Sequence, residues 1–272
     1  YTIVQSTECS LQELCQVLSI PKRTIKEIIR KLNGTILQQL EIQRFIHSTT
    51  KGEIKVDDCH QDEKMTVFYY IKLLFLRESN RFNFLMVLFD SPNHSVSKKL
   101  LLEKLYISPS YLEKLTNQLN QSLEKFHLKI ISRQNCYILK GHELSLRIYI
   151  YYFFSDAFQG IDWPLTSMKF SQAKKFQLSN ELLIPKKAMK LQEQVYLLVA
   201  IFLMRSSHHP LEDNQLNVIY EIMRILKQTK DFTGELKKQL SSYLLENSVR
   251  NEVLSFNFLL CYFFPNLISE QQ

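Results

Sequence analysis

The stretch SLQELCQVLSIPKRTIKEIIRKLN, residues 10–33, predicts two short helices joined by a tight bend. Ser10 is a good N-cap, Glu13 is its capping-box partner, and apolar residues follow at helical spacing. We expect the second helix to end at Asn33 and Gly34, because Gly and Asn favour helix C-termini. The apolar stripe that this helix should bury consists of Ile25, Ile28, Ile29 and Leu32.

The same pattern returns 87 residues later as SKKLLLEKLYISPSYLEKLTNQLN, residues 97–120. Ser97 takes the position of Ser10, and Asn120 takes that of Asn33. The matching apolar pairs are Leu14 and Leu101, Leu18 and Leu105, Ile20 and Ile107, Ile25 and Leu112, Ile28 and Leu115, and Leu32 and Leu119. The remaining positions differ, as expected if one helix-turn-helix scaffold occurs twice with two different surfaces.

A β-prone segment follows each predicted helix pair. Residues 42–56 have turn-forming residues near 49–52, and residues 128–139 have them near 133–135. Each segment therefore predicts a hairpin wing. Between the two modules we expect a polar linker at 57–64, one or two packing helices at 65–89, and a break at 90–97 that contains Pro92.

The remainder of the chain reads as helical. The expected helices are 144–158, 187–204, 215–227 and 236–245, with breaks at 160–164 and 208–210. Only 5 Gly and 7 Pro occur in 272 residues, which favours helices over a sandwich or barrel. The expected fold is mainly α: two winged helix-turn-helix domains with small β wings, followed by an α-helical bundle. The predicted domains are 1–60, 61–141 and 142–272.

The exposed faces of the two second helices are candidate DNA-binding surfaces. In the first module the face is cationic, and its candidate contacts are Lys22, Arg23, Thr24, Lys26, Arg30 and Lys31. In the second module the face is richer in amides, and its candidates are Ser110, Tyr111, Lys114, Asn117, Gln118 and Gln121. Arg and Lys contact guanine edges and phosphates, whereas Asn and Gln suit adenine. A solvated helix surface is the alternative for both faces.

Wing residues are further candidates for phosphate or minor-groove contacts: His47 and Lys51 in the first module, and Arg133 and Lys140 in the second. The formal net charge of +7 agrees with a polyanionic partner without identifying it.

Other function classes lack a sequence signal. The chain has no GxSxG, HExxH, P-loop or GxGxxG motif, so we expect neither an enzyme nor a bound cofactor. The five cysteines have no zinc-binding spacing, and we expect reduced thiols and no metal. The apolar runs are too short or too interrupted to span a membrane, which predicts a cytoplasmic protein. The cysteines are Cys9, Cys15, Cys59, Cys136 and Cys261.

His208 and His209 follow an apolar helix and lie beside Arg205. They are candidates for phosphorylation, because an added negative charge there could change helix packing or dimerisation. A solvent-exposed helix end is the alternative explanation.

The tract LRIYIYYFFSDAFQGIDWP, residues 146–164, follows the second module. Together with the helix repeat, it resembles the Mga-type virulence regulators, and its Trp163-Pro164 pair is similar to the start of their first phosphotransferase-system regulation domain, or PRD. The resemblance implies a DNA-binding transcription regulator, often an activator. It also implies PRD modules that oligomerise and are phosphorylated on histidine by phosphotransferase-system phosphocarrier proteins.

His208 and His209 lie roughly where the first PRD of such regulators carries its histidine. The usual length of the family adds a second PRD and a domain like a sugar-transporter subunit. A chain of 272 residues does not hold them all, so we expect a truncated chain or a short relative.

The leading hypothesis is a regulator that binds double-stranded DNA through both winged modules and forms a homodimer through its helical domain. A plasmid replication initiator with duplicated winged helices is the first alternative, and binding to arrays of short repeats would favour it. A protein-interaction module with vestigial DNA binding is the second, and the cationic face at 22–31 argues against it.

Overall fold

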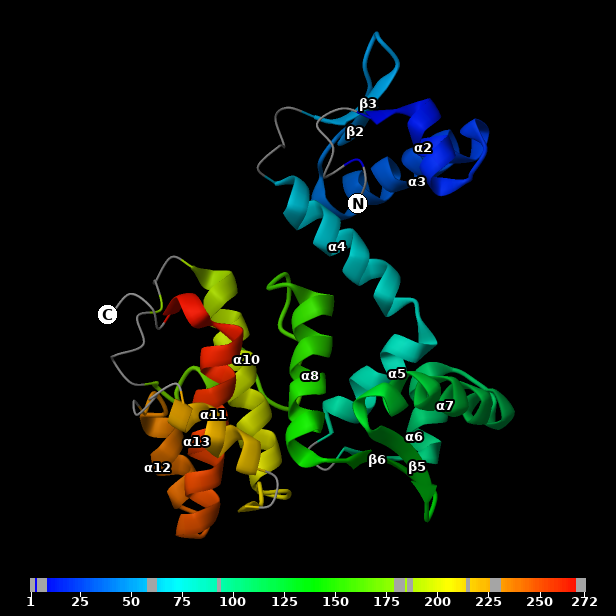
Figure 1. Cartoon of the computed structure of the whole chain (residues 1–272). Helices are drawn as coiled ribbons and strands as arrows, with labels where there is room; N and C mark the ends of the chain where they lie inside the picture. Colours follow the sequence, from blue (N-terminus) through cyan, green and yellow to red (C-terminus); the bar gives the residue numbers. More distant parts are fainter. Residues whose placement is uncertain are drawn as a thin grey trace. The chain divides into compact units, whose positions relative to one another are not determined.

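The structure, a computed structural model, describes residue 3 and residues 9–57, 63–91, 94–178, 184, 188–213, 216–225 and 231–267. It divides into two compact units, Tyr1–Phe75 and Leu76–Gln272. Helices dominate the described residues of both units, and each unit has one small three-stranded sheet (Figure 1). The predicted mainly α class with small β wings is confirmed.

The first unit begins with the predicted helix pair. Its described elements are β1 (Cys9–Ser10), α2 (Leu11–Leu18), α3 (Lys22–Leu40), β2 (Ile46–Ser48), β3 (Glu53–Val56) and all but the last two residues of α4 (Lys64–Arg77). Ser10 caps α2: its Oγ accepts from the Glu13 N–H at 3.1 Å, and Glu13 Oε2 accepts from the Ser10 N–H at 2.7 Å. Ser19 ends the helix in the left-handed region, with φ 53°, and turns the chain toward α3.

The sheet of this unit has the strand order β1-β3-β2, with antiparallel pairing throughout. A turn at residues 49–52 joins β2 to β3, as predicted for the first wing, and Gly52 adopts φ 81° there. Beneath the sheet and helices lies a core that contains Leu14, Ile25, Ile36 and Val67. The helix pair and its hairpin therefore share one hydrophobic core.

Helix α3 is longer than predicted. It continues through Asn33 and Gly34 to Leu40, so the predicted end at these two residues is wrong. Gly34 disfavours a helix interior, but Ile36 beyond it is buried and rewards continuation of the helix. The Asn33 side chain does not cap the helix and instead bonds the backbone of Ile46 in β2.

The second unit opens with a helix pair of the same design. Its elements are α5 (Asn80–Phe89), β4 (Ser95–Ser97), α6 (Lys98–Leu105), α7 (Pro109–Leu123), the 3-10 helix η2 (Glu124–Phe126), β5 (Leu128–Arg133) and β6 (Cys136–Gly141). The strand order, β4-β6-β5, repeats that of the first sheet. Ser97 caps α6, and Tyr106 takes the left-handed conformation of Ser19 with the same φ of 53°. The internal repeat is therefore a repeat of structure as well as of sequence.

An asparagine joins the second helix of each pair to the following hairpin. Asn33 Nδ2 donates to the Ile46 carbonyl at 2.6 Å, and Asn33 Oδ1 accepts from the Ile46 N–H at 2.9 Å. Asn120 makes the same two bonds to Ile130, at 2.9 and 2.7 Å. We call these two arrangements the asparagine bridges. They fix each long helix against the first strand of its hairpin.

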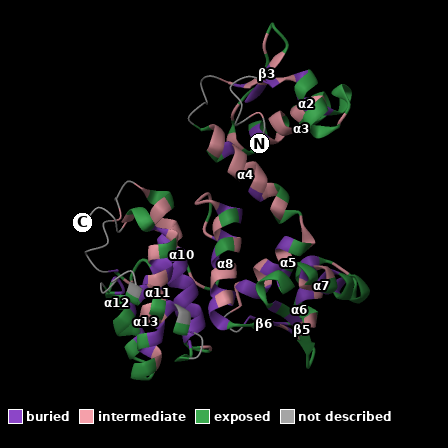
Figure 2. Cartoon of the chain, in the orientation of Figure 1, coloured by how far each residue is buried: buried purple, intermediate pink, exposed green. Residues whose placement is uncertain are grey.

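A helical bundle follows the second sheet. Its elements are α8 (Glu143–Phe158), α9 (Phe170–Ala173), α10 (Met189–Ser206), α11 (Asn217–Ile225), α12 (Glu235–Ser241), α13 (Glu246–Phe263) and the 3-10 helix η4 (Pro265–Leu267). Helix α10 is the central one, since every residue from Val195 to Ser206 is buried (Figure 2). It packs against α8, α12 and α13.

Polar contacts join the second helix pair to this bundle. The Asp90 carboxylate, at the end of α5, accepts from the Thr166 and Ser167 N–H groups at 3.0 Å each and from the Ser167 hydroxyl at 2.7 Å. The Thr166 hydroxyl donates to it as well. Arg77 pairs with Asp162 at 2.6 Å. Both ends of the α5 region are thus attached to the segment after α8.

Several predicted boundaries are only partly described. Four predicted features lie partly or wholly outside the described residues. They are residues 58–62 of the linker, Pro92, the start of the helix predicted at 187–204, and both ends of the helix predicted at 215–227. The predicted division into domains 1–60, 61–141 and 142–272 stays a prediction beside the two compact units.

Replacing Asn120 with Ala should lower the free energy of unfolding of the second unit by about 1–3 kcal/mol, because the N–H and C=O of Ile130 lose their partners in a partly buried site. Urea denaturation measures this change. Asn117→Ala, at an exposed position one turn earlier in α7, is the matched control and should have almost no effect. Equal losses in the two variants would contradict a bridging role.

Candidate nucleic-acid interface

Helix α3 presents a cationic surface. All six residues predicted on this surface are exposed: Lys22, Arg23, Thr24, Lys26, Arg30 and Lys31. Lys31 lies 3.6 Å from Glu27, an exposed pair that contributes little to stability. For the other four cations no carboxylate partner occurs among the ion pairs of the described residues. The structure therefore brings the six predicted side chains together on one open helix.

Two of the apolar positions of the first pair are more exposed than predicted. Ile28 was expected in the buried stripe but is 40% exposed, and Leu18 is 46% exposed. Their counterparts Leu115 and Leu105 are buried in the second unit, where α5 packs against α6. The sequence repeat alone could not reveal this difference.

Helix α7 presents a more neutral surface. Ser110, Tyr111, Lys114, Asn117 and Gln121 are exposed on it. Ser108 caps the helix by accepting from the Tyr111 N–H at 3.2 Å, and its hydroxyl lies 3.1 Å from that of Ser110. These hydroxyl and amide groups are available to a partner at the start and along the open side of the helix.

Gln118 differs from the other predicted residues of α7. It is only partly exposed, and its Oε1 accepts from Arg81 Nη2 at 2.8 Å. Arg81 belongs to the first turn of α5 and was not predicted as a site residue. A sequence pattern gives no reason to pair residues from these two helices. The pair adds a cation to the side of α7.

The second hairpin carries the predicted wing cations. Gln134 and Asn135 form its turn with φ values of 50° and 58°, the left-handed pair that two-residue hairpins require. Arg133 and Lys140 are exposed, and Lys140 lies directly opposite Lys129, which is also exposed. Like charges facing each other across a ladder destabilise a sheet, so a polyanion beside them would relieve repulsion. In the first hairpin, Lys51 is exposed and His47 is partly buried.

Charge is distributed unevenly along the chain. Residues 76–141 contain ten Lys and Arg residues and five Asp and Glu residues. Most of the net charge of +7 thus belongs to the second helix pair and its surroundings. Although the α7 surface itself is nearly neutral, its module has a positive field that attracts polyanions.

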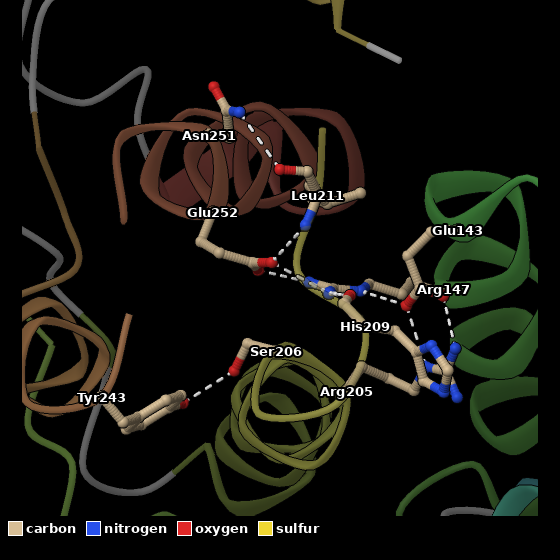
Figure 3. Close-up of polar contacts among 9 residues, drawn as sticks. All are labelled: Glu143, Arg147, Arg205, Ser206, His209, Leu211, Tyr243, Asn251 and Glu252. Carbon is tan, nitrogen blue, oxygen red and sulfur yellow. Dashed lines mark hydrogen bonds and ion pairs between the residues drawn. The ribbon is translucent and has the colours of Figure 1, made fainter. Parts of the chain in front are cut away.

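A buried cluster of charges joins three helices of the bundle (Figure 3). Glu143 of α8 accepts from Arg147 Nε at 2.9 Å and from Arg205 Nε of α10 at 2.8 Å. Glu252 of α13 pairs with the guanidinium of Arg147, which also lies 4.6 Å from the centre of the Phe202 ring. We call these two Arg and two Glu residues the buried charge cluster.

The pKa values in the cluster favour its charged forms. Burial alone would raise the pKa of Glu143, but Arg205 and Arg147 outweigh burial and lower it. Burial alone would lower the pKa of Arg147, but Glu252 and Glu143 raise it. The sequence places Arg147 within the apolar tract 146–154, and a single charge there is a signal of a buried pair that sequence reasoning missed.

The two predicted histidines lie in the loop that this cluster holds. Arg147 Nη2 donates to the His209 carbonyl at 3.0 Å, and Glu252 Oε1 accepts from the Leu211 N–H at 2.9 Å. His208 is exposed, with Nδ1 2.7 Å from the Ser207 hydroxyl. The ring of His209 is partly buried, and its pKa is lowered by burial and then by the charge of Arg205, with a smaller contribution from Lys140.

A third histidine lies deeper. His94, beside β4, is buried, and its Nδ1 lies 2.8 Å from the Ser91 carbonyl and 3.2 Å from that of Leu88. Burial, followed by the charge of Arg205, lowers its pKa to about 3. His94 is therefore neutral at physiological pH and serves the packing of the second helix pair.

The described residues contain neither a metal-binding group nor a membrane-spanning helix. No group of three or more His, Cys, Asp and Glu residues among them is placed to hold a metal ion. Of the helices that they form, none has the length and apolar character needed to cross a bilayer.

Comparison with known families identifies one matching segment. Residues 68–154 match the family described as the Mga helix-turn-helix domain. The match runs from within α4 to within α8 and includes the second helix pair and its hairpin. No curated protein matches the chain. The match supports a Mga-type regulator, and hence a DNA-binding transcription regulator with DNA as a partner.

Replacing Arg147 with Met should lower the unfolding free energy by about 3–5 kcal/mol, because Glu252 is left buried without its counter-charge. Thermal unfolding measures the loss. The double variant Arg147→Met, Glu252→Gln removes both charges and should recover part of the stability. No recovery in the double variant would contradict a direct ion pair as the source of the loss.

Proposed function

We propose that this chain, which carries a Mga-type helix-turn-helix domain at residues 68–154, regulates transcription by binding duplex DNA through both of its helix pairs. The observation that carries the proposal is the structural repeat: the first pair, outside the matched segment, has the same serine cap on its first helix, the same left-handed turn, the same asparagine bridge and the same strand order as the second. In each winged module the second helix is the recognition helix.

The first recognition helix, α3, supplies most of the cationic contacts in this proposal. Arg23, Lys26 and Arg30 meet phosphates or guanine edges, with Lys22 and Lys31 at the sides of this surface. Thr24, in the first turn, bonds a phosphate near the helix N-terminus. Each phosphate contact releases counterions, so affinity should fall steeply as the salt concentration rises.

The second recognition helix, α7, reads bases mainly by neutral groups. Asn117 and Gln121 suit adenine edges, while Ser110, Tyr111 and Lys114 suit the backbone or bases near the helix start. Gln118 acts together with Arg81, which occupies its carbonyl oxygen. Arg133 and Lys140 of the second hairpin, and His47 and Lys51 of the first, contact flanking phosphates or the minor groove.

The helical part, 142–272, is a PRD-like regulatory domain that forms a homodimer in this proposal. The resemblance of residues 146–164 to the start of a PRD supports this division. The proposal also includes activation as the direction of regulation, which the same family resemblance implies. The domains are then 1–60, 61–141 and 142–272.

Reversing two charges on α3, Arg23→Glu with Lys26→Glu, should weaken specific DNA binding roughly 100-fold or more, since each lost contact costs about 1–3 kcal/mol. Fluorescence anisotropy on a genomic fragment that the wild-type chain selects measures this. Lys174→Glu with Lys175→Glu changes the net charge equally at exposed positions after α9 and should retain most of the affinity. Unchanged binding by a folded α3 variant would remove α3 from the interface.

Regulation through the histidine loop is a second part of the proposal. Phosphotransferase-system phosphocarrier proteins would phosphorylate His208 or His209. The supporting observation is electrostatic: in addition to burial, Arg205 and Lys140 lower the pKa of His209 while Glu143 raises it, so a phosphoryl group there would meet two cations and one carboxylate. Because Arg147 holds the His209 carbonyl, a change in this loop bears directly on the buried charge cluster.

Incubation with a phosphocarrier protein and its phosphoryl donor should label the chain with an acid-labile phosphate, as a phosphohistidine requires. The label should be lost in the double variant His208→Ala, His209→Ala and kept in His142→Ala, a histidine at the start of α8. Mass spectrometry locates the label. Full labelling of the double variant would place phosphorylation elsewhere.

The alternatives differ in what they bind. A replication initiator should select arrays of short direct repeats and open them, whereas a regulator should select promoter-proximal fragments. An interaction module with vestigial DNA binding should select no fragment at all. The exposed cationic surface of α3 is the observation that favours DNA binding over the last alternative.

A further inference from the structure

Tyr106 is an exception among the large side chains of the second helix pair. It is 93% exposed, at the turn between α6 and α7. No hydrogen bond, ion pair or ring contact of its side chain occurs among those found for the described residues. Neither packing within the chain nor internal hydrogen bonding accounts for an aromatic residue at this position.

The backbone of Tyr106 also disfavours a tyrosine. Its φ of 53° and ψ of 43° lie in the left-handed region, where Gly and Asn are the favoured residues. The turn itself requires this conformation, since Ser19 adopts φ 53° and ψ 38° at the same point of the first pair. A bulky residue kept in a disfavoured conformation, without a contact inside the chain, indicates a role toward a partner.

The position of the turn indicates the partner. In helix-turn-helix proteins the N-terminal residues of the recognition helix contact base edges in the major groove. Tyr106 stands two residues before Ser108, the N-cap of α7, and four before the exposed Ser110. A side chain at this end of the recognition helix comes next to the sugar-phosphate backbone that borders the groove. Tyrosine hydroxyls are among the groups that bond phosphate oxygens there.

We propose that Tyr106 contacts the DNA backbone beside α7, with its hydroxyl donating to a phosphate oxygen and its ring covering the adjacent sugar, and so positions the recognition helix. This inference rests on the proposed function, because it assumes that α7 enters a groove. The inference adds an uncharged residue to the interface. Because Tyr106 is neutral, its contribution to affinity can be measured separately from that of the cations.

Tyr106→Asn is the main test, since Asn tolerates the left-handed conformation. The variant should unfold about 1–3 °C higher than the wild type and bind the selected DNA fragment roughly fivefold to tenfold more weakly. The slope of affinity against salt should stay as in the wild type, because a neutral contact releases no counterion. By contrast, loss of a phosphate-bound lysine lowers that slope by about one.

Two further variants complete the design. Tyr106→Phe keeps the ring and should lose only part of the affinity, which isolates the hydroxyl. Gln159→Asn makes the matched change at another left-handed position, φ 50° after α8, and should leave DNA binding unchanged.

The outcomes are distinct. Wild-type DNA affinity in both Tyr106 variants overturns the contact. If such a variant also loses its effect on transcription, Tyr106 is assigned to a protein partner. A wild-type chain that binds no duplex fragment overturns the proposed function, and the contact with it. Weaker binding at an unchanged salt slope in the Tyr106 variants, with wild-type binding in Gln159→Asn, supports the contact.

Discussion

Each proposed recognition surface depends on one side-chain amide. Asn33 and Asn120 satisfy both the N–H and the C=O of a residue in the first hairpin strand, so they fix the helix and the wing as one piece. A helix and a hairpin that moved independently could not hold their side chains at the spacing of a DNA groove. The amide can replace backbone partners in this way because it carries both a donor and an acceptor.

Apolar spacing and cap residues predicted both helix pairs, both hairpins and the exposed surfaces of α3 and α7. They failed where a distant residue decides the outcome. The predicted end of α3 at Asn33 and Gly34 was wrong because Ile46 takes the asparagine amide and Ile36 is buried. The pairing of Arg81 with Gln118 and the buried charge cluster likewise arise from contacts between separate elements, and no local pattern predicts the exposure of Ile28.

Polar and charged side chains join the second helix pair to the bundle. Asp90 accepts hydrogen bonds from Thr166 and Ser167, and Glu143, two residues after β6, binds Arg205 in the middle of the bundle. Leaving a buried charge without its partner is costly, which applies to Glu143 but not to the more exposed Asp90. In the proposed function, a phosphoryl group in the loop at His209 would act first on Arg147, which holds the His209 carbonyl, and through it on Glu143 at the start of α8.

The central claim is that the repeated helix pairs bind specific duplex DNA. Its most direct test is to let the purified chain select genomic fragments at two salt concentrations and to sequence them. The account predicts a few enriched promoter-proximal fragments whose binding weakens steeply at the higher salt concentration, as contacts to several phosphates require. Uniform recovery of all fragments, or none at either salt concentration, would contradict it.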